Sequence, residues 1–305
     1  MATGGPDSGP GGGAGSGDEP HPQILLRFRD LADSYDAVLC DIWGVVHNGV
    51  RAWPDACDAL HRFRDGGGHV VLITNAPRPA ESVRAQLDHL KVPHHSYDAI
   101  VTSGDLTRAM VGARQGQKLF HLGPQRDLGV FEGLDVELVG ADAAEAVVNT
   151  GLFDDENETP DDYHAMLQSF LDRKLEMICA NPDVVVERGD RLIYCAGAVA
   201  DAYETMGGTV HWAGKPHPPI YDAALELVES AAGGSVARSG VLAIGDSLRT
   251  DLAGARRSGV DSLFVASGIH GAELVRETAL DLPVLEESFR QAEVWPRAVM
   301  TRLVW

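Results

Sequence analysis

Residues 37–49 read AVLCDIWGVVHNG, an apolar run that stops at Asp41 and continues into a loop with two glycines. A second run, HVVLITN at 69–75, stops at Thr74 and Asn75, and a third, VLAIGD at 241–246, stops at Asp246. Short continuous apolar runs are typical of strands buried on both faces of a parallel sheet. Because the carboxyl ends of parallel strands share one edge of a sheet, where open α/β folds bind ligands, we expect these polar residues to meet there.

Helical segments separate the expected strands. Residues 54–64 have helical spacing, with Pro54 near the first turn and glycines 66–68 as the stop. Residues 250–258 form a second such segment, which ends before Gly259. This alternation predicts an α/β fold built on a Rossmann-like parallel sheet.

The middle of the chain carries its own alternating pattern. Strands are expected at 118–122, 136–139, 146–149 and 177–180, and a helix at 161–171. Because the runs that end in polar residues lie on both sides of this block, we expect an inserted α/β domain at 100–208 and a core formed by 22–99 and 209–305. Residues 1–21 are expected to be a disordered tail, since the first 20 contain 8 Gly and 3 Pro and almost no apolar side chains.

The composition excludes several classes of protein. The 305 residues include 45 Asp and Glu against 25 Lys and Arg, a formal charge of −20, which argues against nucleic acid as a partner. No apolar run reaches the roughly 20 residues that span a bilayer, and the N-terminus does not resemble a signal peptide. The cysteines lie far apart and predict neither a disulfide framework nor a zinc site. We therefore expect a cytoplasmic protein without a membrane partner.

Four segments follow one another along the chain: DIWGVVHNG at 41–49, ITN at 73–75, GKPHPPIYDAAL from Gly214, and GDSLRTD at 245–251. Together they resemble the haloacid dehalogenase (HAD) superfamily, in particular the subclass IIA with a large inserted α/β cap, the group of the N-acetylglucosamine-phosphate and pyridoxal-phosphate phosphatases. The resemblance covers about residues 35–275, and the DxWGV pattern at 41–45 looks like a less studied branch. It implies a HAD core with an inserted cap domain and a Mg²⁺-dependent hydrolase of a small phosphorylated metabolite.

Three aspartates are candidates for the reaction centre. Asp41 can supply the carboxylate nucleophile that phosphoryl transfer needs, although an Asp after a strand is equally typical of a turn. Asp246 and Asp251 lie five residues apart across a strand-to-helix turn, so both carboxylates can face one cation, and hard oxygen ligands beside a phosphate favour Mg²⁺. The resemblance assigns the ion to Asp41, Asp246 and the backbone carbonyl of Trp43, with Asp251 acting from behind these ligands.

A lysine and a threonine also receive roles from the resemblance. Lys215 would hold both the nucleophile and a phosphoryl oxygen, and Thr74 would donate its hydroxyl and backbone N–H to the phosphate. Without the motifs, Lys215 would be read as a surface lysine and Thr74 as a strand-end cap. The Gly-Lys pair is no Walker loop, because Pro216 stands where Ser or Thr is required.

Trp43 departs from the phosphatase pattern. Phosphatases of this superfamily carry a second Asp two residues after the nucleophile, which protonates the leaving oxygen, and Trp cannot exchange a proton in this pH range. Loss of such an acid typically costs on the order of 10² to 10⁴ in rate. The leaving group could need no acid, His47 could act instead, or the protein could be a metabolite-binding or regulatory protein that keeps the fold. A dehalogenase also lacks the second Asp, but the large cap favours a phosphatase.

Further polar residues are candidates for binding the substrate. Asn48 and Asn75 would contact it from the core, together with His47. Asn181 and Asp183 belong to an N-P-D segment that resembles the part of the cap lying over the substrate, although N-P-D is also a common turn. The expected partner is a small phosphorylated metabolite, and a homodimer is compatible with the sequence.

Overall fold

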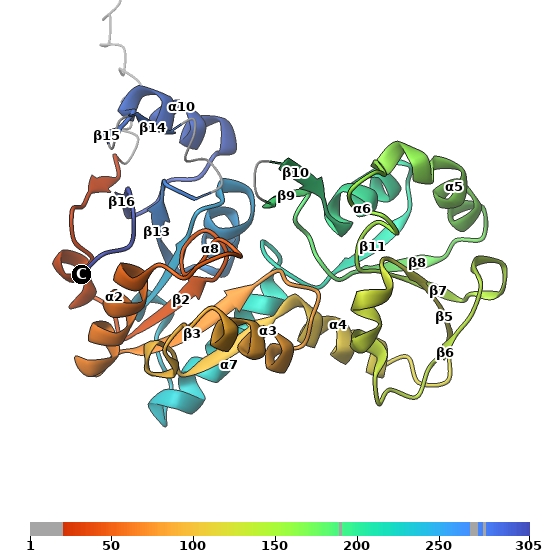
Figure 1. The fold of residues 1–305 in the computed structure, drawn as a ribbon, viewed down its shortest axis with the longest axis horizontal. Coiled ribbons are helices and arrows are strands. Elements are labelled where there is room, and N and C mark those ends of the chain that lie inside the picture. Colours follow the sequence, from red (N-terminus) through yellow and green to blue (C-terminus); the bar gives the residue numbers. More distant parts are fainter. Residues whose placement is uncertain (1–20, 189–190, 269–273, 277–278) are drawn as a thin grey trace, which may run out of the picture.

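The computed structural model describes residues 21–188, 191–268, 274–276 and 279–305, so residues 1–20 of the expected tail lie outside it. Two larger sheets, each with its own helices, lie side by side (Figure 1). The larger sheet has seven parallel strands in the order β1-β16-β13-β12-β2-β3-β4. The second has five parallel strands in the order β11-β8-β7-β5-β6. The predicted α/β fold with a Rossmann-like parallel sheet is confirmed.

The seven-stranded sheet is built from both ends of the chain. In sheet order its strands are β1 (Gln23–Ile24), β16 (Ala298–Met300), β13 (Asp261–Val265), β12 (Val241–Gly245), β2 (Ala37–Asp41), β3 (His69–Thr74) and β4 (Ala99–Thr102). Its helices are α1 (Arg29–Ala32), α2 (Pro54–Asp65), α3 (Ala80–His89), α7 (Pro218–Ala232), α8 (Ala253–Ser258) and α10 (Leu282–Ala292).

The five-stranded sheet comes from the middle of the chain. Its strands are β11 (Thr209–Trp212), β8 (Glu176–Cys179), β7 (Ala146–Asn149), β5 (Lys118–Leu122) and β6 (Glu137–Leu138). Helices α4 (Ser103–Gly112), α5 (His164–Asp172) and α6 (Ala196–Thr205) accompany it, and the hairpin of β9 (Val185–Arg188) and β10 (Arg191–Tyr194) reaches toward the larger sheet (Figure 1).

Strand pairing bears on both ends of the inserted domain that we expected at 100–208. Strand β4 pairs with β3 in the larger sheet, although 100–102 were expected in the insertion. Strand β11 pairs with β8 in the smaller sheet, although 209–212 were expected in the core. The sequence of a short strand does not show which sheet it joins, because this depends on the neighbouring strands with which it pairs. We propose residues 103–212 as the inserted unit.

Strand β2 lies near the centre of the larger sheet and is buried along its whole length. Its side chains alternate in direction: Val38 and Cys40 belong to the hydrophobic core beneath α2, and Ala37 and Leu39 to the core beneath α7. Asp41 is therefore held at the end of a strand that is packed on both faces. Among the described residues, no helix is both long and apolar enough to cross a membrane.

Candidate active site

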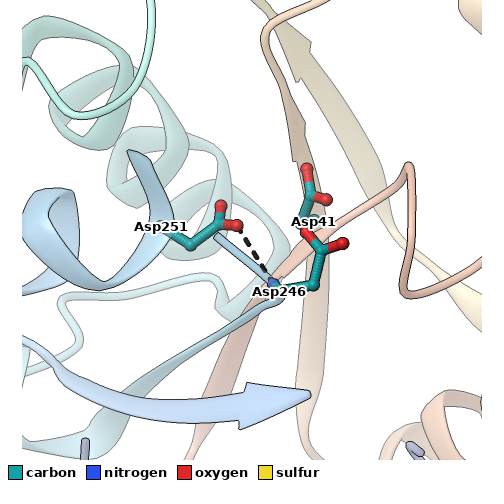
Figure 2. Close-up of side chains that lie close together, drawn as sticks. All are labelled: Asp41, Asp246 and Asp251. Atoms are coloured by element: carbon teal, nitrogen blue, oxygen red, sulfur yellow. Dashed lines mark hydrogen bonds between the residues drawn. The ribbon is translucent and has the colours of Figure 1, made fainter. Parts of the chain in front are cut away.

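Three of the predicted aspartates meet at the carboxyl edge of the larger sheet. Asp41 is the last residue of β2, Asp246 directly follows β12, and β12 pairs with β2. Asp251 lies in the π-helical turn η6 (Leu248–Leu252) that comes next. All three are buried, and one carboxylate oxygen from each lies within 4.8 Å of the others (Figure 2). Alternating strands and helices thus produce a compact acidic cluster, as the sequence pattern predicts.

Lys215 is the cation of this cluster. Its side chain is only 3% exposed, and its Nζ donates to Asp41 Oδ1 at 2.5 Å and to Asp251 Oδ1 at 2.6 Å. Burial alone would lower the pKa of Lys215, but the two carboxylates outweigh it and hold the pKa well above its usual value. Burial raises the pKa of Asp41 to about 7, with Lys215 opposing the rise and Asp251 adding to it. The reading of Lys215 as a surface lysine is wrong.

Asp251 organises the turn behind the cluster. Its Oδ2 accepts from the backbone N–H of Asp246 at 3.2 Å and of Ser247 at 3.1 Å, while its Oδ1 accepts from Lys215. Figure 2 shows the first of these bonds, which orients the backbone that carries Asp246. Both oxygens of Asp251 therefore already accept hydrogen bonds, one from Lys215 and the other from the turn.

Asn75 joins the core to the inserted unit. Its Oδ1 accepts from the backbone N–H of Lys215 at 2.7 Å, and its Nδ2 donates to the Lys215 carbonyl at 3.0 Å and to Asp183 Oδ1 at 2.9 Å. Asp183 belongs to the inserted unit, and burial raises its pKa, against the effect of Lys215. The buried side-chain amide of Asn75 therefore fixes the backbone of Lys215 and also binds the Asp183 carboxylate of the inserted unit.

The loop after Asp41 depends on two glycines. Gly44 has φ +88°, and a Cβ there would lie 2.0 Å from Asp246 Oδ2. Gly49 has φ +82°, and a Cβ there would lie 2.4 Å from the Trp43 ring. Only glycine combines this backbone conformation with so close an approach, so the loop can pack against both Asp246 and the indole.

His47 lies inside this loop rather than in the site. It is 2% exposed, its ring forms a T-shaped contact with that of Trp43 at a centroid distance of 5.3 Å, and its Nδ1 accepts from the Gly49 N–H at 3.0 Å. Burial lowers the pKa of His47 to about 4, so the imidazole is neutral near pH 7. The geometry gives His47 a structural role in the loop.

A cavity of about 490 Å³ opens over the acidic cluster. Of the residues predicted to bind substrate, Asn48, Asn75 and Asp183 line it, whereas His47 and Asn181 are not among its lining residues. Asn181 Oδ1 instead accepts from the Asp183 N–H at 3.1 Å, which is the turn geometry of an N-P-D segment. The lining also includes Asp41, Trp43, Thr74, Lys215, Asp246 and Asp251.

Several lining residues were not predicted. Trp53 comes from the loop after Asp41, and valines 184–186 come from the inserted unit. Arg249 lies on η6 and forms an ion pair with Asp201 on α6, so it joins the two units beside the cavity. The position of Arg249 within GDSLRTD and that of the valines directly after the N-P-D segment were usable signals, whereas no sequence motif marks Trp53.

The donor set fits a divalent cation. Asp41 and Asp246 present buried carboxylate oxygens close to one another, and Gly44 and Gly268 approach the Asp246 carboxylate so closely that a Cβ at either position would clash with it. Hard oxygen ligands of this kind suit Mg²⁺. The Trp43 carbonyl, predicted as a third ligand, comes from the loop that lines the same cavity.

Comparisons with known proteins point to one family. The family model described as haloacid dehalogenase-like hydrolase matches residues 38–137, and one described as HAD-hydrolase-like matches residues 212–291. A solved haloacid dehalogenase-like hydrolase from Brucella suis 1330 is 47% identical, with a TM-score of 0.82, covering 92% of this chain and 100% of its own. Ribonucleotide monophosphatase NagD of Escherichia coli (strain K12) is 28% identical over 240 residues, 76% of this chain and 88% of its own. Chronophin of Bos taurus is 27% identical over 272 residues, 81% of this chain and 86% of its own.

Proposed function

Because the chain belongs to the haloacid dehalogenase-like hydrolase family and is a phosphoric monoester hydrolase, we propose that it cleaves a small phosphorylated metabolite through an aspartyl phosphate on Asp41. The family predicted from the four sequence segments, with its subclass, is confirmed. The name of the Escherichia coli relative, ribonucleotide monophosphatase, supports a small phosphate ester as the substrate.

One observation carries the proposal: Asp41 is buried at a strand end, 2.5 Å from a buried lysine and beside two further carboxylates, at the floor of a cavity. A carboxylate held rigidly in this way is suited to in-line attack, since little reorganisation is needed when the reaction begins. A surface turn or a structural ion pair would need neither the cavity nor the third carboxylate.

The proposed reaction has two displacements. A carboxylate oxygen of Asp41 attacks phosphorus, the bond from phosphorus to the leaving oxygen breaks, and that oxygen takes a proton from solvent water. Water then attacks phosphorus and gives up a proton to solvent, the bond between Asp41 and phosphorus breaks, and phosphate leaves. Lys215 offsets charge on the phosphoryl oxygens, and the Thr74 hydroxyl donates to one of them. Mg²⁺, held by Asp41, Asp246 and the Trp43 carbonyl, would supply further charge stabilisation.

Trp43 limits the choice of substrate. It lines the cavity where other members of the superfamily have a proton donor, and the buried, neutral His47 does not face the cavity. We therefore propose a substrate whose leaving oxygen needs little protonation. Trp43, Trp53 and valines 184–186 offer an apolar wall for its organic part.

The inserted unit is proposed to act as a cap over the substrate. Asp183 and the three valines reach the cavity from this unit, while Asn75 and Arg249 make polar contacts to it from the core. A cavity of about 490 Å³ lined by both units suits a small molecule better than a polymer.

Purified protein should be assayed with Mg²⁺ against phosphorylated sugars, nucleotides, cofactors and p-nitrophenyl phosphate. We expect Asp41→Asn to lose at least about 10²-fold in turnover, because the variant lacks the nucleophile. Asp30→Asn, an exposed change of the same chemistry on α1, is the matched control. Near-normal turnover by Asp41→Asn would show that the aspartyl-phosphate mechanism is wrong.

Trp43 also favours a second candidate function, a metabolite-binding or regulatory protein with reduced catalysis. The same panel separates the two functions: saturable binding of a phosphorylated metabolite, without release of phosphate from any ester, would support the binding protein. Phosphate release that disappears in Asp41→Asn would support the enzyme.

A further inference from the structure

A second pocket, of about 510 Å³, lies on the core and is distinct from the catalytic cavity, and we call it the basal pocket. It is formed by residues 50–52 of the loop after Asp41, the first half of α2, the end of α3 with the turn after it, and the 3-10 helix η1 (His94–Ser96). None of its lining residues lines the catalytic cavity. The proposed phosphatase reaction makes no use of it.

The charge of the basal pocket is opposite to that of the chain. Five of its twelve lining residues can carry positive charge: Arg51, His61, His89, Lys91 and His95. One, Asp58, is acidic, and its carboxylate pairs with the guanidinium of Arg62 at 2.8 Å. In a chain of formal charge −20, such a local excess of cationic and N–H donor groups is typical of an anion site.

The walls of the pocket are held by internal bonds. Ser96 Oγ donates to the Cys57 carbonyl at 3.2 Å, which joins η1 to α2. The Arg64 guanidinium donates to the His95 carbonyl at 2.5 Å, and the rings of His61 and His95 lie 4.1 Å apart between centroids. A site whose walls are already ordered loses less entropy on binding.

We infer that the basal pocket binds a small organic oxyanion, a metabolite bearing phosphate or carboxylate groups. Arg51 and Lys91 would supply the permanent charges, and the imidazoles of His89 and His95 would supply further N–H donors, whereas His61 Nε2 already faces the Asp65 carboxylate at 3.4 Å. Apolar lining from Val50, Cys57, Leu90 and Pro93 leaves room for a carbon skeleton beside the charged groups.

The loop after Asp41 connects this site to the catalytic cavity. Asn48 lines the catalytic cavity, and its Oδ1 accepts from the backbone N–H groups of Val50 and Arg51 at 3.1 and 3.0 Å. The Arg51 guanidinium lies 4.6 Å from the ring centroid of Trp53, which also lines the catalytic cavity. An anion bound to Arg51 would therefore contact the loop after Asp41, which contributes lining residues to both the basal pocket and the catalytic cavity.

Equilibrium dialysis of the full chain with inorganic phosphate, and separately with malonate, tests the inference. Metal-free buffer is used, because the three carboxylates of the catalytic cluster then oppose anion binding there. We expect saturable binding to wild type and at least about tenfold weaker binding to Arg51→Gln/Lys91→Gln, since two charge-assisted contacts are lost. The control, Arg29→Gln/Lys174→Gln, makes the same change of charge and also alters an exposed lysine with positive φ.

Binding of both probes supports an oxyanion site in general, and binding of phosphate alone supports a phosphorylated ligand. Shifts of the His61 and His95 imidazole resonances on titration would place the anion in the basal pocket. Three results would overturn the inference: no saturable binding of either probe, unchanged binding by Arg51→Gln/Lys91→Gln, or equal weakening in the control pair. Circular dichroism on all variants checks that each has folded.

Discussion

Replacing Lys215 by Met should destabilise the metal-free protein as well as abolish catalysis. Methionine keeps most of the length of the side chain but removes an ammonium that is 2.5 Å from Asp41 and 2.6 Å from Asp251. The side chains of these carboxylates are only 8% and 5% exposed, so water cannot replace the lost partner. Removing one partner of a buried ion pair typically costs about 3–5 kcal/mol of unfolding free energy.

That loss can be measured. Domains typically have 5–15 kcal/mol of stability, so the variant should still fold. Each kcal/mol lowers Tm by roughly 2–4 °C in a chain of this size, which gives an expected drop of roughly 6–20 °C. Urea unfolding and thermal scans without metal give the two quantities, and Lys118→Met, on an exposed lysine, is the control.

Two further measurements identify the cause. Mg²⁺ should restore more stability to Lys215→Met than to wild type, since a cation can take over the unpaired carboxylates. Adding Asp41→Asn to Lys215→Met should recover part of the loss, because one buried charge is then removed, and a double-mutant cycle measures the coupling. A Lys215→Met protein that unfolds at the wild-type midpoint in metal-free buffer would refute the reasoning.

Three other predictions follow from the loop after Asp41. Gly44→Ala should lose Mg²⁺ affinity and turnover, because its Cβ would lie 2.0 Å from Asp246 Oδ2. The control Gly67→Ala, at a glycine with φ +95° and open space around it, should keep both. Equal losses of Mg²⁺ affinity in the two variants, measured by Mg²⁺ titration, would argue against the metal site. The unfolding free energy of wild type, relative to that of His47→Gln, should decrease as pH falls from 6.5 to about 4, because His47 binds a proton in the unfolded chain but stays neutral when buried in the folded one. Urea unfolding across this pH range measures the difference. An increase in the relative unfolding free energy of wild type as pH falls would contradict the prediction. Trp43→Asp should raise turnover on alkyl phosphates by about 10²-fold or more if the acid is correctly placed, and much less on p-nitrophenyl phosphate. A folded, Mg²⁺-binding variant with equal effects on both substrates would refute the missing-acid explanation.

The arrangement of Asp41, Thr74 and Asp246 could be predicted because it depends on one local rule. Apolar runs that end in polar residues become parallel strands, and parallel strands end at the same edge. The seven-stranded sheet follows this rule at β2, β3 and β12. The positions of site residues that lie at strand ends can therefore be predicted from the sequence.

Features that depend on distant partners were harder to predict. Nothing within residues 209–212 shows that they pair with β8, and nothing within 184–186 shows that they reach a cavity on the other unit. His47 looked available for proton transfer, but the turn made by Gly44 and Gly49 carries its ring inward against Trp43. Such positions are set by tertiary contacts, which a single sequence does not display.

The bonds between Asn75 and Lys215 bear on how this protein could be re-engineered. Lys215 stands three residues after the end of β11, on the connection by which the chain leaves the inserted unit, and Asn75 clamps both its N–H and its carbonyl. A foreign cap grafted between β4 and α7 to change substrate preference would have to reproduce the length of this exit. One residue too many or too few would displace the ammonium from Asp41, so a chimera could have a well-formed new cap and still be inactive.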